Sequence, residues 1–94
     1  MKTEEIITYL NSQGMSKDQA GELANKIEGT NPKIYQALID YIRKGIVPDL
    51  SVEGFTCKGL MDEYRLSITG ALLTLDWLIR EPEEAARAIK EGIK

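Results

Sequence analysis

Apolar residues recur along this chain three or four positions apart, in runs that Gly, Pro, Ser and Thr residues separate. This spacing places the apolar residues of each run on one face of a helix, whereas a strand would need an alternation that no stretch of useful length shows. The pattern predicts six short helices, over residues 4–10, 17–28, 32–44, 57–64, 68–80 and 82–91. We therefore expect an all-α fold, a compact bundle of about six short helices.

The predicted helix ends coincide with residues that satisfy free backbone groups. Ser, Thr and Asn side chains accept hydrogen bonds from the first N–H groups of a helix, and Pro fits the first turn because no N–H is needed there. Glycine ends helices because it adopts the left-handed conformation that follows the last turn. The predicted N-caps are Thr3, Ser16, Asn31, Thr56 and Ser67, the prolines that begin helices are Pro32 and Pro82, and the glycines that end them are Gly14, Gly29 and Gly45.

The helix predicted over 32–44 indicates how the chain is organised. Ile34 and Leu38 lie along one side of it, and Ile39 lies along another. A helix that is apolar on two sides needs two packing partners, so we predict that residues 1–94 form a single domain. Its predicted parts are a three-helix unit at 3–45, a linker at 46–55 and, packed on the first unit, a second helical unit at 56–94.

Gly21 and Gly70 fall inside predicted helices, where a glycine costs about 1 kcal/mol relative to alanine. Such a cost is accepted where a second helix approaches closely. We therefore interpret both glycines as packing residues.

Composition narrows the chemistry that the chain can perform. Its 94 residues include 12 Lys or Arg, 15 Asp or Glu and no His, which gives a net charge of −3. This acidic balance disfavours binding to nucleic acid and to anionic membrane surfaces. The absence of histidine removes the most common general base and the most common metal ligand. We therefore expect a protein that is not an enzyme and that uses no metal or cofactor.

The sequence also predicts where the protein resides. Its single cysteine, Cys57, cannot form an intramolecular disulfide. The N-terminus is acidic and lacks the apolar core of a signal peptide. The longest apolar stretch, residues 72–79, contains Thr74 and Asp76 and is far shorter than the ~20 residues that a membrane-spanning helix needs. We therefore expect a cytoplasmic protein that does not associate with membranes.

Two local patterns have a chemical as well as a structural interpretation. Cys57 falls in the first turn of a predicted helix beside Lys58, a setting that lowers a thiol pKa, but it also fits as a small space-filling residue. Residues 49–54 place oxygen-bearing side chains and a glycine as in the opening of an EF-hand calcium loop. The twelfth position of such a loop is Leu60 here instead of glutamate. We favour the structural interpretation of both patterns.

Residues 56–78 resemble a helix-turn-helix of the kind found in winged-helix DNA-binding domains. The resemblance lies in the Thr56 cap, the Leu66-Ser67 turn and apolar residues at helical spacing on both sides of it. A recognition helix offers donors and cations to bases and phosphates, whereas residues 68–79 contain no Lys or Arg. DNA binding is therefore the alternative function, and its candidate contacts are Arg65, Ser67 and Thr69.

Residues 4–45 resemble a ubiquitin-associated (UBA-like) three-helix domain. The resemblance is carried by the run from Gly14 to Ala20 with Leu23 after it, and by Ala37-Leu38-Ile39 and Tyr41-Ile42 in the closing helix. In that family a loop and the last helix form a hydrophobic patch that binds other proteins. The resemblance implies that the protein-binding residues are Gly14, Met15, Leu38 and Ile42.

The leading functional prediction is a small helical protein that acts by binding another protein or a second copy of itself. The apolar excess of residues 72–79 supports it, because Leu73 and Trp77 form an exposed patch unless both are accommodated in the core. The alternative is a helix-turn-helix regulator that binds DNA.

Overall fold

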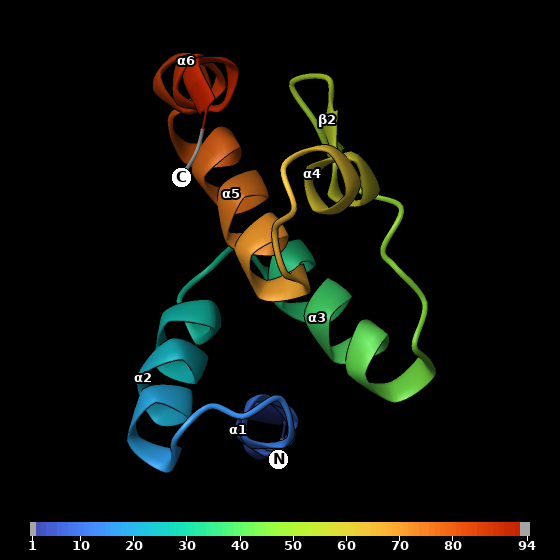
Figure 1. The fold of residues 1–94 in the computed structure, drawn as a ribbon, viewed down its shortest axis with the longest axis vertical. Helices are drawn as coiled ribbons and strands as arrows, with labels where there is room; N and C mark the ends of the chain where they lie inside the picture. Colours follow the sequence, from blue (N-terminus) through green and yellow to red (C-terminus); the bar gives the residue numbers. More distant parts are fainter. Residues whose placement is uncertain (1, 93–94) are drawn as a thin grey trace. The chain divides into compact units, whose positions relative to one another are not determined.

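The computed structural model describes residues 2–92, and in this range the chain forms six α-helices and one two-stranded sheet (Figure 1). The predicted all-α class is therefore confirmed. The elements are α1 (Lys2–Ser12), α2 (Lys17–Glu28), α3 (Pro32–Lys44), β1 (Ser51–Val52), β2 (Phe55–Thr56), α4 (Cys57–Glu63), α5 (Ile68–Arg80) and α6 (Pro82–Gly92). The chain divides into two compact units, Met1–Ile46 and Val47–Lys94.

Side-chain caps fix the starts of four helices where the sequence predicts them. In each case a hydroxyl or amide oxygen accepts a hydrogen bond from an N–H group of the first turn, which otherwise has no partner in the helix. The bonds run from Gln19 N–H to Ser16 Oγ (3.2 Å), from Lys33 N–H to Asn31 Oδ1 (2.9 Å), from Gly59 N–H to Thr56 Oγ1 (2.9 Å) and from Gly70 N–H to Ser67 Oγ (3.1 Å).

The predicted N-cap at Thr3 is wrong. Helix α1 already includes Lys2, so Thr3 lies inside its first turn. Its hydroxyl is instead hydrogen-bonded to the hydroxyl of Tyr35 in α3, with 3.2 Å between the two oxygens. A long-range side-chain partner of this kind leaves no mark in the local sequence.

The first unit consists of α1, α2 and α3, and α1 contacts both of the other helices. Each helix buries apolar residues at helical spacing, as the sequence pattern predicts. The buried residues of this unit are Ile6, Leu10, Ala20, Ala24, Ile27, Ile34, Ala37, Leu38 and Ile39.

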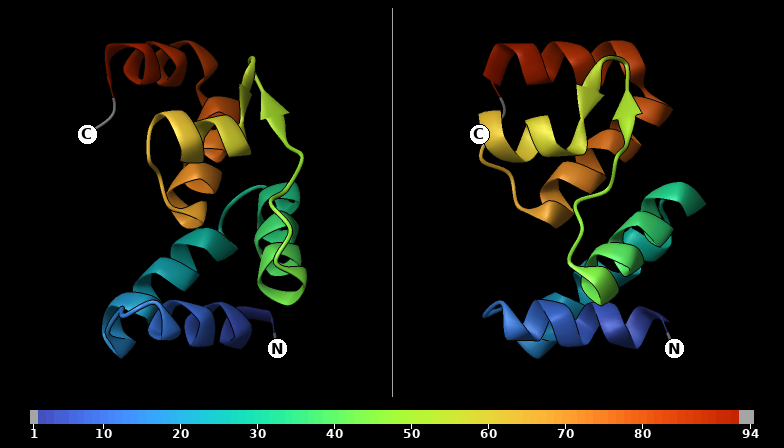
Figure 2. Two further views of the ribbon diagram at one scale, coloured as in Figure 1. Left: turned by 45° about the vertical axis from the view of Figure 1, so that its right-hand side comes forward. Right: turned by 90° about the vertical axis from the view of Figure 1, so that its right-hand side faces the viewer.

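The second unit begins with a hairpin that the sequence does not predict. β1 and β2 are antiparallel, with Val52 opposite Phe55, and the chain then passes directly into α4 (Figure 2). The two turn residues, Glu53 and Gly54, have φ angles of 52° and 82°. Positive φ at both central residues is what a type I′ hairpin turn requires. The predicted linker at 46–55 therefore contains ordered pairing, and the string that resembles a calcium loop includes β1 and the hairpin turn.

Helix α5 is the central helix of the second unit, since it contacts α4, α6 and β1. Its buried residues are Ile68, Thr69, Ala71, Leu72, Leu75, Asp76 and Leu78. The turn that leads into it contains Arg65 in the left-handed conformation, with φ at 57°. No helix within residues 2–92, α5 included, has the length and apolar character needed to cross a membrane.

The interpretation of Gly21 and Gly70 as sites of close helix approach is wrong. Within residues 2–92, no heavy atom of a neighbouring element lies within 4 Å of the position that a Cβ on Gly21 would take. At Gly70 the nearest atoms are Ser67 Oγ at 3.3 Å and Leu66 Cβ at 3.7 Å, which belong to the cap and the turn before the same helix. Neither glycine is needed to let a second helix approach.

Candidate functional site

Only part of the UBA-like contact set lies at the surface. Leu38 is 0% exposed, so it offers no surface to a partner, and this predicted contact is wrong. The closing helix is buried on the side where Leu38 lies, and the sequence pattern does not reveal which side stays open. Ile42 and Met15 are half-buried, and Gly14 is exposed in the turn after α1, with φ at 96°.

Ile42 lines an open groove between α1 and α3, which we call the α1–α3 groove. Its volume is about 440 Å³. Gly14 and Met15 are not among its lining residues. The α1 residues that line it follow the helical spacing of three and four, so they occupy one face of that helix. Among the described residues, the lining consists of Glu4, Glu5, Thr8, Tyr9, Ser12 and Ile42.

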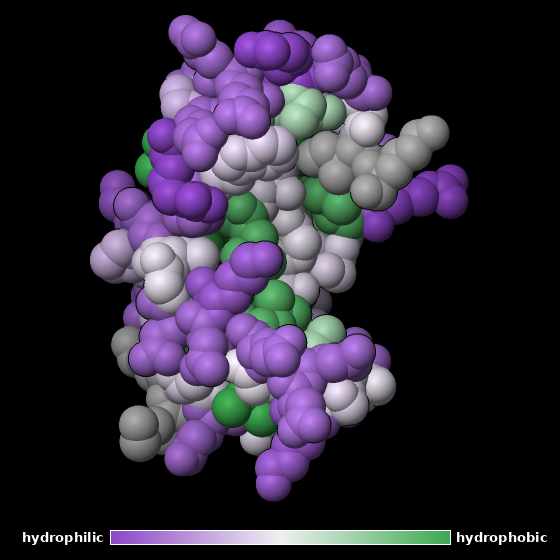
Figure 3. All heavy atoms as spheres, turned by 90° about the vertical axis from the view of Figure 1, so that its left-hand side faces the viewer, coloured by the Kyte–Doolittle hydropathy of each residue, from purple (hydrophilic) through white to green (hydrophobic). Residues whose placement is uncertain are grey.

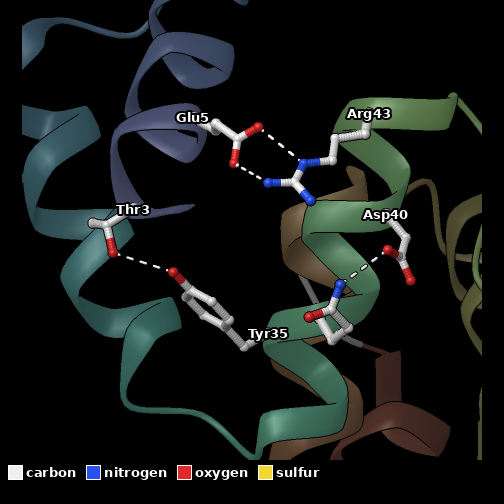
Figure 4. Close-up of polar contacts among 6 residues, drawn as sticks. Thr3, Glu5, Tyr35, Asp40 and Arg43 are labelled. Carbon is white, nitrogen blue, oxygen red and sulfur yellow. Dashed lines mark hydrogen bonds and ion pairs between the residues drawn. The ribbon is translucent and has the colours of Figure 1, made fainter. Parts of the chain in front are cut away.

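A bidentate ion pair joins the two helices of the groove (Figure 4). Arg43 donates from Nε to Oε1 of Glu5 at 3.0 Å and from Nη2 to Oε2 at 2.8 Å. The Glu5 carboxylate raises the pKa of the Arg43 guanidinium, first through these hydrogen bonds and then through charge attraction. Both side chains are well exposed, 49% for Arg43 and 36% for Glu5, so water screens the pair and it adds little to stability.

Two tyrosines supply the aromatic packing between the same two helices. The rings of Tyr9 and Tyr41 meet edge to face, with centroids 6.1 Å apart and an interplanar angle of 88°. Burial, followed by charge repulsion and hydrogen bonding with Tyr41, raises the pKa of Tyr9. Tyr9 therefore stays neutral at physiological pH and presents a ring to the α1–α3 groove.

The residues predicted to contact DNA lie in and after the turn between α4 and α5. Thr69 is buried, with 8% exposure, so its prediction as a surface contact is wrong. Ser67 is exposed, but its hydroxyl caps α5 and lies 3.1 Å from Thr69 Oγ1. Of the three, Arg65 alone presents an exposed cationic side chain.

The sequence predicts an exposed apolar patch at Leu73 and Trp77 unless both side chains fit into the core. The two residues lie four positions apart on one face of α5, and both are half-buried. Within residues 2–92 the large hydrophobic residues with high exposure are instead Ile46 (66%) and Ile79 (40%). On the face drawn in Figure 3, small hydrophobic areas lie among hydrophilic ones. The exposure of Ile46 could have been expected from the sequence, because Ile46 follows Gly45, the residue that ends α3.

Cys57 lies in a setting opposite to that of a reactive thiol. It is 0% exposed, and burial raises the pKa of its thiol. The sequence pattern next to Lys58 does not reveal this burial. Over residues 2–92 no cluster of three or more Cys, Asp or Glu side chains is placed to hold a metal ion.

Asp76 is a buried charge that the sequence pattern does not mark as a site residue. Its side chain is 5% exposed, and its carboxylate accepts a hydrogen bond from Arg80 Nε at 2.9 Å. The signal for this pair is an acidic residue inside an apolar stretch with an arginine four positions later. The pair lies along α5, and it anchors the exposed Arg80 side chain.

Comparison of the chain with protein-family models, with curated proteins and with solved structures gave no match. No relative therefore carries a function over to this chain. The UBA-like and helix-turn-helix resemblances stay predictions, and the functional argument depends on the side chains described above.

Proposed function

We propose that this chain is a non-enzymatic protein that acts by binding another protein through the α1–α3 groove. The observation that carries the proposal is the presence of Tyr9 and Ile42 in an open groove of about 440 Å³. Tyrosine is enriched at protein interfaces because it offers a large apolar surface with a polar end, and hot spots concentrate in pockets that exclude water. An open groove with an aromatic and an aliphatic side chain offers such residues to a partner, whose binding would exclude the water.

Self-association through Leu73 and Trp77 is a narrower form of the same proposal. Both residues are half-buried, so each leaves only part of its surface for a partner. A stable interface buries about 800 Å² on each side, more than two half-buried side chains provide. Sedimentation velocity over a wide concentration range tests this form. If the protein forms oligomers, and if Trp77→Ala abolishes them while the helical content is retained, the binding surface lies on α5 and not in the α1–α3 groove.

DNA binding remains the alternative function, and the charges of the second unit disfavour it. Residues 47–94 contain six Lys or Arg and nine Asp or Glu, so this half of the chain carries the whole net negative charge. Phosphate contacts require cations and give binding that weakens steeply as salt rises. We expect a labelled mixed-sequence duplex to show no salt-dependent anisotropy change with the full chain. A steep increase at low salt that Arg65→Gln reduces would support the alternative.

Site-specific photo-cross-linking tests the proposal directly. A benzophenone amino acid replaces Thr8, an exposed residue that lines the α1–α3 groove, in cells that normally make the protein. The matched control carries the same group in place of Lys26, an exposed residue of α2 outside the groove. We expect a discrete protein adduct from position 8, absent from position 26, that Ile42→Asp abolishes. No adduct from position 8, or the same adducts from both positions, would overturn the proposal.

A further inference from the structure

We infer that the occupant of the α1–α3 groove is a basic amphipathic segment of a partner protein, with one large apolar side chain flanked by Lys or Arg. This inference rests on the proposed protein-binding function and names the partner's chemistry. Three properties of the groove carry it: the sign of its net charge, the geometry in which it already holds a guanidinium, and its hydrogen-bonding character.

The charges at the groove sum to a negative value, because three carboxylates face the single guanidinium of Arg43, which pairs with Glu5. The groove lining contains two carboxylates, Glu4 and Glu5, and no Lys or Arg among the described residues. A third carboxylate, Asp40 in α3, is close enough to Arg43 to raise the pKa of the guanidinium. Charges arranged in this way attract a positively charged partner and repel an acidic one.

The Glu5 carboxylate of the groove already binds a guanidinium, that of Arg43. Arg43 approaches Glu5 from α3 and makes two parallel hydrogen bonds of 3.0 and 2.8 Å, the planar arrangement in which carboxylates recognise arginine (Figure 4). Because the pair is exposed, its contribution to stability is small, and an arginine from a partner can replace Arg43 at little cost. Arg43 therefore competes with a basic partner for Glu5.

The uncharged part of the groove suits an apolar side chain more than a polar one. Tyr9 and Ile42 provide a ring and an aliphatic group, while the Ser12 hydroxyl donates a hydrogen bond to the backbone carbonyl oxygen of Tyr9 at 2.6 Å. The oxygens of the two lining carboxylates can only accept hydrogen bonds, and the hydroxyls of Thr8 and Tyr9 can do either, so a partner that supplies donors fits the lining better than one that supplies acceptors. Lys and Arg supply donors and no acceptors, which matches the groove.

Fluorescence anisotropy with three labelled synthetic peptides of equal length tests the inference on the full chain. One peptide is a basic amphipathic helix with a central Leu, the second replaces that Leu by Ser, and the third replaces the basic residues by Glu. We expect the first peptide to bind most tightly and its affinity to fall as salt rises. The Leu-to-Ser peptide loses the contact with Tyr9 and Ile42, and the Glu peptide meets Glu4 and Glu5 with like charge.

Four variants of the protein locate the binding. Glu4→Gln removes a groove charge and weakens the basic peptide about threefold, a change typical of an exposed charge pair. Arg43→Gln removes the competitor for Glu5 and strengthens the peptide about threefold, and Ile42→Ala weakens it about tenfold. Glu22→Gln, which removes an exposed α2 carboxylate outside this groove, leaves the affinity unchanged. Circular dichroism confirms that each variant keeps its helices.

The inference is overturned if no peptide binds, if the Glu peptide binds as tightly as the basic one, or if Glu4→Gln and Glu22→Gln have equal effects. The photo-cross-link from position 8 reports separately on whether the groove binds any protein. If position 8 gives a specific adduct but the peptides do not bind as expected, the proposed protein-binding function stands. The inference that the partner segment is basic is then wrong. If the basic peptide binds but position 8 gives no adduct, the groove prefers basic segments in solution. The proposal that it binds a protein in cells is then wrong.

Discussion

Gly21 lies inside α2, and in the part of the chain that the structure describes no heavy atom of a neighbouring element lies within 4 Å of the position that a Cβ would take. Alanine therefore fits without displacing a neighbour, and it loses less backbone freedom on folding than glycine does. We expect Gly21→Ala to raise the free energy of unfolding by about 1 kcal/mol, measured by urea denaturation.

Gly59 provides the matched control for Gly21→Ala. It also lies in a helix, but a Cβ there would stand 2.8 Å from Oγ1 of Thr56, the hydroxyl that caps α4. Gly59→Ala must displace this cap, so we expect the lost cap to offset the gain in helix propensity, and the free energy of unfolding to rise much less than in Gly21→Ala. Equal gains from both substitutions would show that helix propensity alone decides and that the Thr56 cap contributes nothing.

Cys57 is fully buried, and burial raises the pKa of its thiol. Thiol reagents attack the thiolate, so we expect the folded protein at neutral pH to react far more slowly than protein unfolded in urea. The folded state also keeps the proton that the unfolded state loses at the ordinary thiol pKa of about 8.5, so stability falls as pH rises above that value. Reaction with a chromogenic disulfide and urea denaturation at several pH values measure the two effects.

A double variant controls for the reagent in the Cys57 experiment. Cys57→Ala together with Lys58→Cys moves the thiol by one residue to an exposed position of the same helix. We expect this thiol to react in the folded protein as fast as in the unfolded one. Rapid reaction of native Cys57 itself would mean that α4 opens readily and that the buried position does not protect the thiol.

At the scale of a secondary-structure element, the β1–β2 hairpin contains a non-glycine residue, Glu53, in a left-handed turn position with φ at 52°. Asparagine adopts this conformation more easily, and Asn-Gly is the preferred pair for a type I′ turn. We expect Glu53→Asn to raise the free energy of unfolding on the order of 0.5–1 kcal/mol. Asp49→Asn removes the same charge outside the turn and should leave stability unchanged. Equal shifts from both would assign the effect to charge.

Four of the helices were predictable from sequence to their first residue because two signals agree at each of those four. Apolar spacing predicts the face that is buried, and a capping side chain predicts the residue at which the helix begins, as Ser16 and Ser67 show. The hairpin was not predictable in this way. Strands of two residues are too short to show alternation, and Glu53 is not a residue that signals a hairpin turn.

The candidate site was predictable only in part. Leu38 and Ile42 are four residues apart on α3, and the sequence pattern treats them alike, yet Leu38 is fully buried while Ile42 lines a groove. Their common spacing on α3 does not distinguish the two residues. The contacts that hold α1 against α3, between Arg43 and Glu5 and between Tyr35 and Thr3, join residues more than thirty positions apart. Local spacing carries no information about such pairs.

At the scale of the whole molecule, the sequence predicts one cooperative domain, because the helix at 32–44 is apolar on two sides. The position of the single tryptophan allows this prediction to be tested. Trp77 lies in α5, so its fluorescence reports on the second unit, whereas circular dichroism reports on the helices of both units. A two-state domain gives the same transition by both probes.

Substitutions that remove one buried methyl group from either unit complete the test. Ile6 in α1 and Ile89 in α6 are both 0% exposed, and Ile→Val at such positions costs about 1 kcal/mol. Ile89→Val must shift the Trp77 transition to lower urea in any case, because both residues belong to the second unit. If the chain unfolds as one domain, Ile6→Val shifts the Trp77 transition by a similar amount, since loss of either unit then unfolds both. A Trp77 transition that Ile6→Val leaves in place, while the dichroism curve broadens, would show that the two units unfold independently.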